Sequence, residues 1–320
     1  MRAIDHTFAE IELPDPVPAG RDLLVKVEAV SVNPVDTKQR KLGSPTPKVL
    51  GWDAAGIVQA VGPQVSLFKP GDAVYYAGDV TRPGCDSELH LVDERIVGSK
   101  PKSLDFAQAA AIPLTAITAW EAFFDRLRIK EHKTMLIIGG AGGVGSIGIQ
   151  LAKAAGLTVV ATASRPESIA WVKQLGADQV LDHHRDMPQQ LQALGRKHVD
   201  YIGCFNDLDP HWAAIGEMIA PQGAIVAIVG NQKPLPMDAV RMKSAALCWE
   251  LMFTRPRFQT PDMMEQHRLL NEVAARLDGG KLRGTLRETL SPINGANLRA
   301  AHTKLESGTM IGKLVLKSWS

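Results

Sequence analysis

Residues 135–146 read Met-Leu-Ile-Ile-Gly-Gly-Ala-Gly-Gly-Val-Gly-Ser, an apolar run that ends in a burst of glycine. An amphipathic segment continues to Lys153, so the pattern predicts a strand, a tight turn and a helix. The glycines fit G-x-G-x-x-G, where they allow the bend, the approach of the backbone to phosphates and the packing of the helix on the strand. Such a helix N-terminus binds a pyrophosphate, although glycine-rich turns also occur for structural reasons alone. The predicted contacts to a dinucleotide come from Gly140, Gly142, Gly143, Val144 and Gly145.

Alternating strands and helices follow this turn. Hydrophobic patterning predicts further strands at residues 157–162, 179–181, 199–205, 224–229 and 245–252, and helices at 167–175 and about 211–219. The segment 245–252 is apolar enough to be a strand buried on both faces. This alternation is typical of an α/β fold with a Rossmann-type doubly wound parallel sheet in the order 3-2-1-4-5-6. The dinucleotide is expected at the switch point beside the first strand.

The end of the second predicted strand bears on the choice of cofactor. An NAD-specific fold usually places Asp or Glu here to hold the ribose 2′-OH, whereas residues 161–166 read Ala-Thr-Ala-Ser-Arg-Pro. Ser164 can donate a hydrogen bond to a 2′-phosphate, and Arg165 can pair with it in a charge-assisted way. We therefore expect NADPH rather than NADH. An alternative, that this segment caps the next helix, stays open and is compatible with cofactor binding.

Composition limits the class of protein. At 320 residues the chain is long enough for two domains. Its 36 Lys and Arg against 34 Asp and Glu are dispersed along the chain, so no nucleic acid or membrane partner is expected. Three widely spaced cysteines, Cys85, Cys204 and Cys248, indicate free thiols in a reducing compartment. No apolar run approaches the ~20 residues of a membrane span, and no signal peptide is evident, so a cytoplasmic location is expected.

The first third of the chain has short β-branched runs separated by Gly, Pro and Asp. Strands are predicted at residues 23–32, 56–61 and 73–76, with a Lys-Pro-Gly-Asp turn at 69–72, which indicates a small β-barrel. Near the other end, residues 262–277 are strongly helical and run into the glycine stop at 279–280.

Several segments together carry a family resemblance: residues 29–37, 51–58, 113–120 and 312–316, and the glycine turn. They resemble the medium-chain dehydrogenase/reductase superfamily over essentially the whole chain. The resemblance implies a GroES-like β-barrel catalytic domain at 1–113, a Rossmann NADPH-binding domain at 114–253, and a return to the catalytic domain at 254–320. Members commonly pair their sheets through the sixth strand, so a homodimer is expected, with a monomer as the alternative.

Zinc-dependent alcohol dehydrogenases of that superfamily carry a ligand Cys where this chain has Asn33, and Gly-His-Glu where it has Gly51-Trp52-Asp53. Neither Asn33 nor Trp52 offers a normal zinc donor. The four-cysteine structural lobe is missing too, because Cys85 is the only cysteine in that part of the sequence. We therefore expect no zinc and no other metal ligands. The closest resemblance is to the quinone oxidoreductase-like branch, in its zinc-type alcohol dehydrogenase-like subgroup.

The chemistry that remains without a metal is narrower. Oxidising an unactivated alcohol would lose its main transition-state stabilisation, whereas quinones and α,β-unsaturated carbonyls accept hydride to give delocalised anions. The sequence thus predicts an NADPH-dependent oxidoreductase that reduces a small quinone or enone. Two alternatives stay open: a zinc-type alcohol dehydrogenase, and a low-turnover NADPH-binding protein.

The resemblance implies roles for several polar residues. Asn33 would lie beside the nicotinamide and donate to a substrate oxygen, with an Asx turn before Pro34 as the alternative. Asp36 occupies the position of a family acid and would orient Asn33 or water, unless it is a solvated turn carboxylate. Tyr76 is a candidate proton donor because it has an ionisable hydroxyl, although water could serve instead.

Other candidates shape the site or bind the cofactor. With Tyr76, the residues Trp52, Trp249, Met252 and Phe253 could form a slot for a flat ring, though each could equally be a core residue. By resemblance, Thr115 would approach the nicotinamide, with a helix N-cap as the alternative. His183 follows the third strand and would contact the cofactor near the adenosine phosphate, unless it is merely a surface residue.

Overall fold

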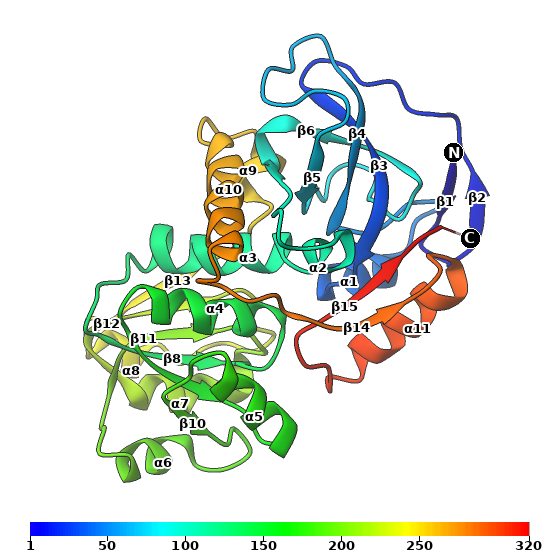
Figure 1. Cartoon of the computed structure of the whole chain (residues 1–320). Helices are drawn as coiled ribbons and strands as arrows, with labels where there is room; N and C mark the ends of the chain where they lie inside the picture. The colour runs from blue at the N-terminus through cyan, green and yellow to red at the C-terminus, as the bar shows by residue number, and fades with distance from the viewer. Residues whose placement is uncertain (320) are drawn as a thin grey trace. The chain divides into compact units, whose positions relative to one another are not determined.

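The computed structural model describes residues 1–319, and the chain divides into two compact units (Figure 1). The first unit comprises Met1–Ile117 and the chain from Met252 to its end, and the second comprises Thr118–Leu251. The helix α3 (Pro113–Trp120) contains the first division and continues into a π-helical turn, η2 (Glu121–Arg126). The two divisions therefore fall a few residues from the limits at 113 and 253 that the sequence predicts.

The second unit is built on six parallel strands. They are β8 (Thr134–Ile138), β9 (Thr158–Thr162), β10 (Gln179–Leu181), β11 (Val199–Cys204), β12 (Ile219–Ala227) and β13 (Ala246–Trp249). Their order is β10-β9-β8-β11-β12-β13, the predicted 3-2-1-4-5-6. The strand β8 is buried along its whole length, as expected for the centre of a doubly wound sheet. The switch point therefore lies between β8 and β11.

Helices connect these strands, namely α4 (Gly143–Ala154), α5 (Pro166–Gln174), α6 (Met187–Ala193), α7 (Trp212–Met218), α8 (Asp238–Arg241) and the short 3-10 helix η3 (Asp209–His211). The helix α4 packs on β8 and β9, and α5 packs on β10. The predicted helices at 167–175 and 211–219 correspond to α5 and α7. Each helix buries apolar residues: Ile215 of α7 packs into the core of the sheet, and Trp171 of α5 is buried with its Nε1 donating to Ser146 Oγ of α4 at 2.8 Å.

The burial of one strand differs from its prediction. The sequence indicates that the last strand is buried on both faces, but β13 has Ala246 and Trp249 exposed, the latter by 46%. The physical reason is position: β13 is the edge strand of the sheet and pairs with β12 alone among the described strands. An apolar run does not by itself distinguish a central strand from an edge strand.

The first unit is built on a seven-stranded sheet. Its strands are β3 (Asp22–Ser31), β4 (Ala54–Val61), β5 (Ala73–Tyr76), β6 (Leu89–Asp93), β7 (Val97–Ser99), β14 (Leu286–Leu290) and β15 (Lys313–Lys317). The order is β14-β15-β3-β4-β5-β7, with β6 also paired to β3. The strands predicted at 23–32, 56–61 and 73–76 correspond to β3, β4 and β5. Because β15 pairs antiparallel with β3, the C-terminal segment joins the sheet formed by the first third of the chain.

Helices and a small hairpin complete this unit. They are β1 (Arg2–Ile4), β2 (Glu10–Glu12), α1 (Pro34–Leu42), η1 (Glu94–Ile96), α2 (Phe106–Ala110), α9 (Thr254–Phe258), α10 (Met264–Asp278) and α11 (Gly295–Glu306). The predicted helix at 262–277 is α10, which packs on β7 and η1 and is followed by Gly280 at φ 67°. None of the described helices is long and apolar enough to cross a membrane.

Candidate functional site

The glycine turn between β8 and α4 has the geometry that the sequence predicts. A Cβ at Gly145 would lie 2.3 Å from the Gly139 carbonyl oxygen, and one at Gly140 would lie 2.9 Å from Ala161 Cβ. Both positions therefore require glycine for close packing. Gly142 differs: within 4 Å of a Cβ at this position there is a single heavy atom, the Gly139 carbonyl oxygen at 3.5 Å. The space in front of Gly142 is open, as a phosphate requires.

The residue that makes the bend lies one position before the predicted motif and was not among the predicted site residues. Gly139 has φ 83°, in the left-handed region that favours glycine, and its N–H donates to Thr162 Oγ1 at 3.0 Å. The signal was present as the first glycine after the apolar run, but the motif begins its count one residue later. The hydrogen bond to Thr162 attaches the turn to the end of β9.

The N-terminus of α4 faces the same open space. Gly142 is the N-cap residue and supplies no capping side chain, so Gly143, Val144 and Gly145 carry the first amides of the helix. A helix leaves these N–H groups without intrahelical acceptors, and its dipole adds partial positive charge. Together with the space at Gly142, these donors fit a pyrophosphate.

At the end of β9, Arg165 caps the next helix, which is one of the two roles that the sequence left open, and its binding of a 2′-phosphate stays a prediction. It is the N-cap residue of α5, and its backbone N–H donates to Ser168 Oγ at 3.1 Å. Its side chain is 40% exposed, with Nε 3.5 Å from Glu167 Oε1. Capping uses the backbone, so it does not prevent the guanidinium from binding an anion. A 2′-phosphate would compete with Glu167 for it.

His183 lies next to this segment, because the Ala163 N–H donates to the Leu181 carbonyl at 3.0 Å across β9 and β10. Its ring centroid is 4.2 Å from that of His184 and 6.3 Å from that of His211. Burial and the neighbouring imidazole of His184 lower the pKa of His183, so the His183 ring is held neutral. His183 is half-buried rather than freely exposed.

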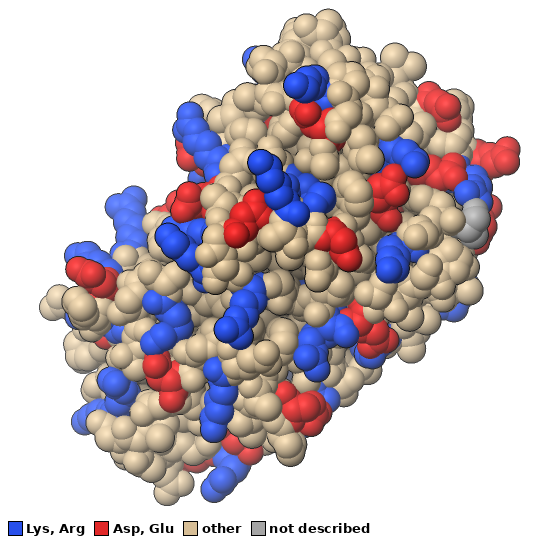
Figure 2. Space-filling model, viewed as in Figure 1, with Lys and Arg blue, Asp and Glu red and all other residues tan. Residues whose placement is uncertain are grey.

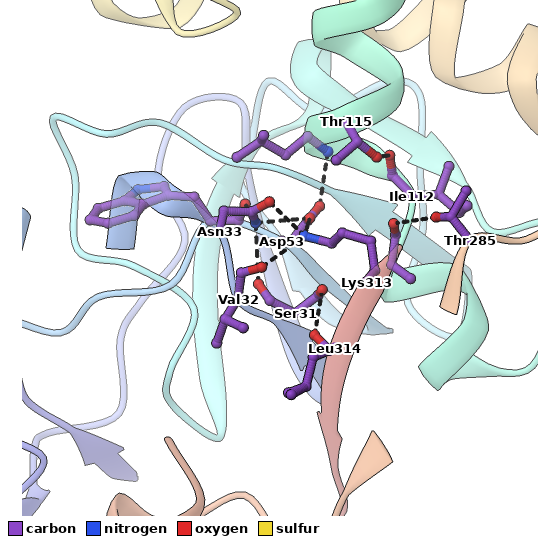
Figure 3. Close-up of polar contacts among 12 residues, drawn as sticks. Ser31, Val32, Asn33, Asp53, Ile112, Thr115, Thr285, Lys313 and Leu314 are labelled. Atoms are coloured by element: carbon purple, nitrogen blue, oxygen red, sulfur yellow. Dashed lines mark hydrogen bonds and ion pairs between the residues drawn. The ribbon is translucent and has the colours of Figure 1, made fainter. Parts of the chain in front are cut away.

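A buried polar network lies in the first unit (Figure 3). The Lys313 ammonium donates to the Val32 carbonyl oxygen at 2.9 Å and to Asn33 Oδ1 at 2.5 Å, and lies 3.1 Å from Asp53 Oδ2. The side chain of Lys313 is 2% exposed and that of Asp53 is 0% exposed. A buried charge requires such partners, because water cannot solvate it.

The Asn33 amide is fully engaged within this network. Its Nδ2 lies 3.0 Å from Asp53 Oδ2, and 3.3 Å from both the Ser31 and Trp52 carbonyl oxygens. Donation to a substrate oxygen stays a prediction, and it requires one of these contacts to be given up. Asn33 is also the N-cap residue of α1, directly before Pro34, so the turn position that the sequence left as an alternative is compatible with its place in this network.

Asp53 connects the network to α3. Its Oδ1 accepts the Leu114 N–H at 2.9 Å. Burial is the largest influence on the pKa of Asp53 and raises it, while Lys313, Asn33 and the Leu114 N–H oppose the shift. All of these partners are donors, so a proton on the carboxyl would have no acceptor, and the geometry supports the carboxylate. Sequence reasoning missed Lys313 and gave Asp53 no role, although a lysine opening an apolar strand was a visible signal.

Thr115 is buried within α3, and its Oγ1 donates to the Ile112 carbonyl oxygen at 3.0 Å. It is therefore the third residue of the helix and not its N-cap, which the sequence left as an alternative. Its contact with a nicotinamide stays a prediction.

Asp36 lies beside this network and is only 1% exposed. Its Oδ2 accepts the Asn33 N–H at 2.5 Å, whereas its Oδ1 is buried without a hydrogen-bond partner among residues 1–319. Burial raises the pKa of Asp36 to about 7, against the opposing effects of the Asn33 and Trp52 N–H groups and of Lys313. The alternative of a solvated turn carboxylate is therefore wrong. Asp36 can hold a proton near neutral pH.

The hydroxyl of Tyr76 is hydrogen-bonded to a buried histidine. His90 Nδ1 lies 3.1 Å from the Tyr76 hydroxyl, and Nε2 lies 3.0 Å from the Pro83 carbonyl oxygen. A carbonyl only accepts, so Nε2 carries the hydrogen and the Tyr76 hydroxyl donates to Nδ1. Burial lowers the pKa of His90 to about 4, which keeps it neutral. Burial also raises the pKa of Tyr76, and its side chain is fully buried, so this geometry lends no support to a proton-donor role.

The aromatic residues predicted to form a slot are mostly packed. Trp52 and Phe253 meet edge to face at 6.4 Å, and the Trp52 Nε1 donates to the Asp79 carbonyl oxygen at 3.1 Å. Trp52, Tyr76, Met252 and Phe253 are all at most 3% exposed. Trp249 belongs to the second unit, on β13. In this structure the four buried side chains are core residues, which is the alternative that the sequence left open.

The residues at the usual zinc positions do not fit zinc. Asn33 Oδ1 accepts from an ammonium, and the Trp52 indole is a donor. Burial raises the pKa of the nearby Cys85 thiol, which disfavours the thiolate that zinc binds. Among the described residues, no group of three or more His, Cys, Asp or Glu side chains is arranged to hold a metal ion.

Comparisons with known proteins agree with this architecture. Residues 19–104 match the family model of the alcohol dehydrogenase GroES-like domain, and residues 143–268 match that of the zinc-binding dehydrogenase. A zinc-type alcohol dehydrogenase-like protein of Staphylococcus aureus is 43% identical over 318 residues, which cover 97% of this chain and 95% of the relative. A quinone oxidoreductase of Pseudomonas aeruginosa is 31% identical over 311 residues, which cover 93% and 92% of the two chains.

Solved structures extend the likeness. A Rhizobium etli protein provisionally described as a zinc-dependent alcohol dehydrogenase has a TM-score of 0.97 at 51% identity, covering 100% of this chain and 98% of that one. A mycobacterial protein in complex with NADPH has a TM-score of 0.85 at 26% identity, covering 99% and 100%. With its GroES-like domain and Rossmann-type parallel sheet, the chain belongs to the medium-chain dehydrogenase/reductase superfamily, among the zinc-type alcohol dehydrogenase-like proteins.

Proposed function

We propose that this oxidoreductase uses NADPH to reduce a quinone or an α,β-unsaturated carbonyl without a metal ion. The observation that carries the proposal is the cradle at Gly142, open in front and lined by the first amides of α4. Ser164 and Arg165 at the end of β9 favour the 2′-phosphate of NADPH, since no acid is present there to hold a ribose 2′-OH. The NADPH complex of a mycobacterial neighbour supports a nicotinamide cofactor of this type.

The class of hydride acceptor that we propose follows from the cofactor contacts and from the side chains at the usual zinc positions. Bound NADPH would supply the hydride. The chain would bind the cofactor through Gly140, Gly142, Gly143, Val144 and Gly145, with Thr115, Ser164, Arg165 and His183 as further contacts. The donor set at Asn33 and Trp52 does not suit zinc, so a carbonyl that needs a Lewis acid is a poor substrate. Quinones and enones spread the developing charge by conjugation, and the quinone oxidoreductase relative supports this class.

A proton must follow the hydride. Asp36 is the group best suited to hold it, because its carboxyl has a pKa of about 7 and a buried Oδ1 without a partner among the described residues. Asn33 would contribute by hydrogen bonding, either to the substrate oxygen or through its contact with Asp36. Tyr76 is a weaker candidate, since its proton already points at His90.

One acceptor screen tests the proposal. Steady-state oxidation of NADPH should be at least about tenfold more efficient with a quinone or enone than with a simple aldehyde, a difference of about 1.4 kcal/mol in barrier. Robust aldehyde or alcohol turnover with no quinone or enone activity would instead favour the alcohol dehydrogenase suggested by the relatives' names. If NADPH binds and no acceptor reacts, a low-turnover binding protein becomes the better account.

The partners that we propose are a small-molecule substrate and a second copy of the chain. Lys and Arg are interspersed with Asp and Glu on the face that Figure 2 shows, which does not favour nucleic acid or an anionic membrane as a partner. The edge strand β13 carries Trp249, 46% exposed, and Leu251, 48% exposed, follows it. Pairing of β13 with its copy would cover both side chains. Light scattering tests this proposal, and a monomer at micromolar concentration would contradict it.

A further inference from the structure

Lys313 is a cation enclosed by the first unit. It opens β15, and its backbone N–H donates to the Thr285 carbonyl oxygen at 2.9 Å. Its ammonium has three hydrogens and three acceptors, namely Val32 O, Asn33 Oδ1 and Asp53 Oδ2. Lysine is almost never fully buried unless it is paired, so this arrangement calls for an explanation beyond packing.

Two of the three acceptors, Asn33 and Asp53, lie at or next to positions that hold zinc ligands in related enzymes. Asn33 occupies the position of a ligand cysteine in the zinc enzymes that this chain resembles, and Asp53 follows the position of the ligand histidine. In this chain the side chains of both contact the same ammonium (Figure 3). We propose that Lys313 is the resident cation of this site, a positioning residue that holds Asn33 and Asp53 where metal-dependent relatives use zinc.

The ammonium determines which way the Asn33 amide faces. Its contact with Oδ1 directs Nδ2 toward Asp53 Oδ2, 3.0 Å away, and the reversed amide would place an NH2 group against an ammonium. Hydrogen bonding at Oδ1 also polarises the amide and strengthens Nδ2 as a donor. Lys313 therefore acts on any substrate through Asn33 and not by direct contact, because its own three hydrogens are already used.

The same cation holds Asp53 as a carboxylate. Asp53 in turn accepts the Leu114 N–H at 2.9 Å, so one chain of contacts runs from β15 through Asp53 to the start of α3. Removing the ammonium would leave a buried carboxylate without a counter-charge, which is strongly destabilising. It would also leave a space with the size and charge preference of a small alkylammonium ion.

Chemical rescue tests this directly. The variant Lys313→Ala should melt at a lower temperature than the wild type, and ethylammonium chloride should raise its melting temperature in a saturable way. Tetramethylammonium chloride, which has no N–H donor, should not. In Lys313→Ala/Asp53→Asn, which lacks the carboxylate, ethylammonium should have no effect beyond that of sodium chloride. This readout needs no substrate, so it can fail independently of the proposed function.

A second set of variants covers the case in which Lys313→Ala does not fold. Lys313→Arg keeps the charge, and Lys313→Met/Asp53→Asn removes both charges together. Both should fold, and the neutral pair should lose at least about tenfold in kcat with an unchanged Kd for NADPH. This activity readout rests on the proposed function.

The pH profile separates positioning from simple packing. Lys313 lowers the pKa of Asp36 and Asp53 raises it, while Asp86 and Cys85 are the other ionisable groups coupled to it. Lys313→Met should therefore move the alkaline limb of the kcat profile upward in pH, and Asp53→Asn should move it downward. The proposal is overturned if folded Lys313→Ala does not respond to ethylammonium, or if the neutral pair keeps wild-type kcat and pH profile.

Discussion

Replacing Asp36 by Asn should change how the stability of the protein depends on pH. Relative to the wild type, the free energy of unfolding of the variant should be higher at alkaline pH than at acidic pH. Asp36 is 1% exposed, and burial raises the pKa of its carboxyl from the ordinary 3.8 to about 7. Between about pH 4 and pH 7 the folded chain therefore holds a proton that the unfolded chain has released. The contribution of Asp36 to the free energy of unfolding is complete below pH 4 and is lost as the pH rises through 7.

The magnitude follows from the size of the shift. One pKa unit corresponds to about 1.4 kcal/mol, so a shift from 3.8 to about 7 amounts to about 4 kcal/mol over the whole interval. Asn at this position has the same shape, keeps an acceptor for the Asn33 N–H, and does not titrate. The difference in unfolding free energy, variant minus wild type, should therefore rise by about 1.4 kcal/mol per pH unit between pH 4 and pH 7.

Urea denaturation at half-unit steps from pH 4 to pH 8 measures this difference. Asp238→Asn is a matched control, because it makes the same chemical change at a side chain that is 87% exposed and lies 3.1 Å from the neighbouring Arg241 guanidinium. Its difference from the wild type should vary far less over this range than that of Asp36→Asn, because the substitution is made at an exposed side chain. A flat profile for Asp36→Asn, or one that falls with pH, would refute the reasoning, since it would mean that Asp36 is ionised in the folded protein throughout.

Three further outcomes are expected. Arg165→Ala should weaken NADPH binding by about 1.5–3 kcal/mol, the range for hydrogen bonds to charged groups, and leave NADH binding nearly unchanged; equal losses in a fluorescence titration would contradict the 2′-phosphate role. Asn33→Ala should lower quinone turnover by up to the ~100-fold seen when an oxyanion donor is removed, and wild-type kcat would exclude Asn33 from the reaction. Purified protein should hold well under one zinc per chain by elemental analysis and keep its activity in a chelator, whereas stoichiometric zinc with chelator-sensitive turnover would point to the alcohol dehydrogenase alternative.

Local patterns were enough to predict the second unit. Apolar runs and the glycine turn predict the strand order correctly, because each strand of a doubly wound sheet is followed by its own helix. The burial of β13 was predicted wrongly from the local apolar pattern, although the predicted strand order already places this strand at the sheet edge. The apolar pattern of residues 245–252 would be the same in a central strand, which is covered on both sides, and in an edge strand, which is partly exposed. Only the order of the strands decides between the two.

The buried network was out of reach for a different reason. Lys313 and Asn33 are 280 residues apart in sequence, and nothing in either segment shows that they touch. The sequence drew attention to Asn33 and Asp36 because they resemble a known site, but it could not show that the Asn33 amide is engaged or that Asp36 is buried. Likewise, the hydroxyl of Tyr76 appeared to be available until its bond with His90, on another strand, was seen.

A resident ammonium constrains chemistry differently from a zinc ion. Zinc keeps an open coordination position that a substrate oxygen can enter, whereas the three hydrogens of Lys313 are all directed at Val32, Asn33 and Asp53. With Lys313 as the resident cation, its charge reaches a substrate only through the Asn33 amide, which would offer a substrate oxygen one polarised hydrogen bond. One such donor supplies less stabilisation than a Lewis acid in direct contact, so the acceptor itself must delocalise the charge.

The selectivity for quinones and enones over aldehydes should then depend on Lys313. The neutral pair Lys313→Met/Asp53→Asn should lose activity with both classes of acceptor. The loss should be larger with the aldehyde, because the oxyanion formed from an aldehyde depends more on the hydrogen bond.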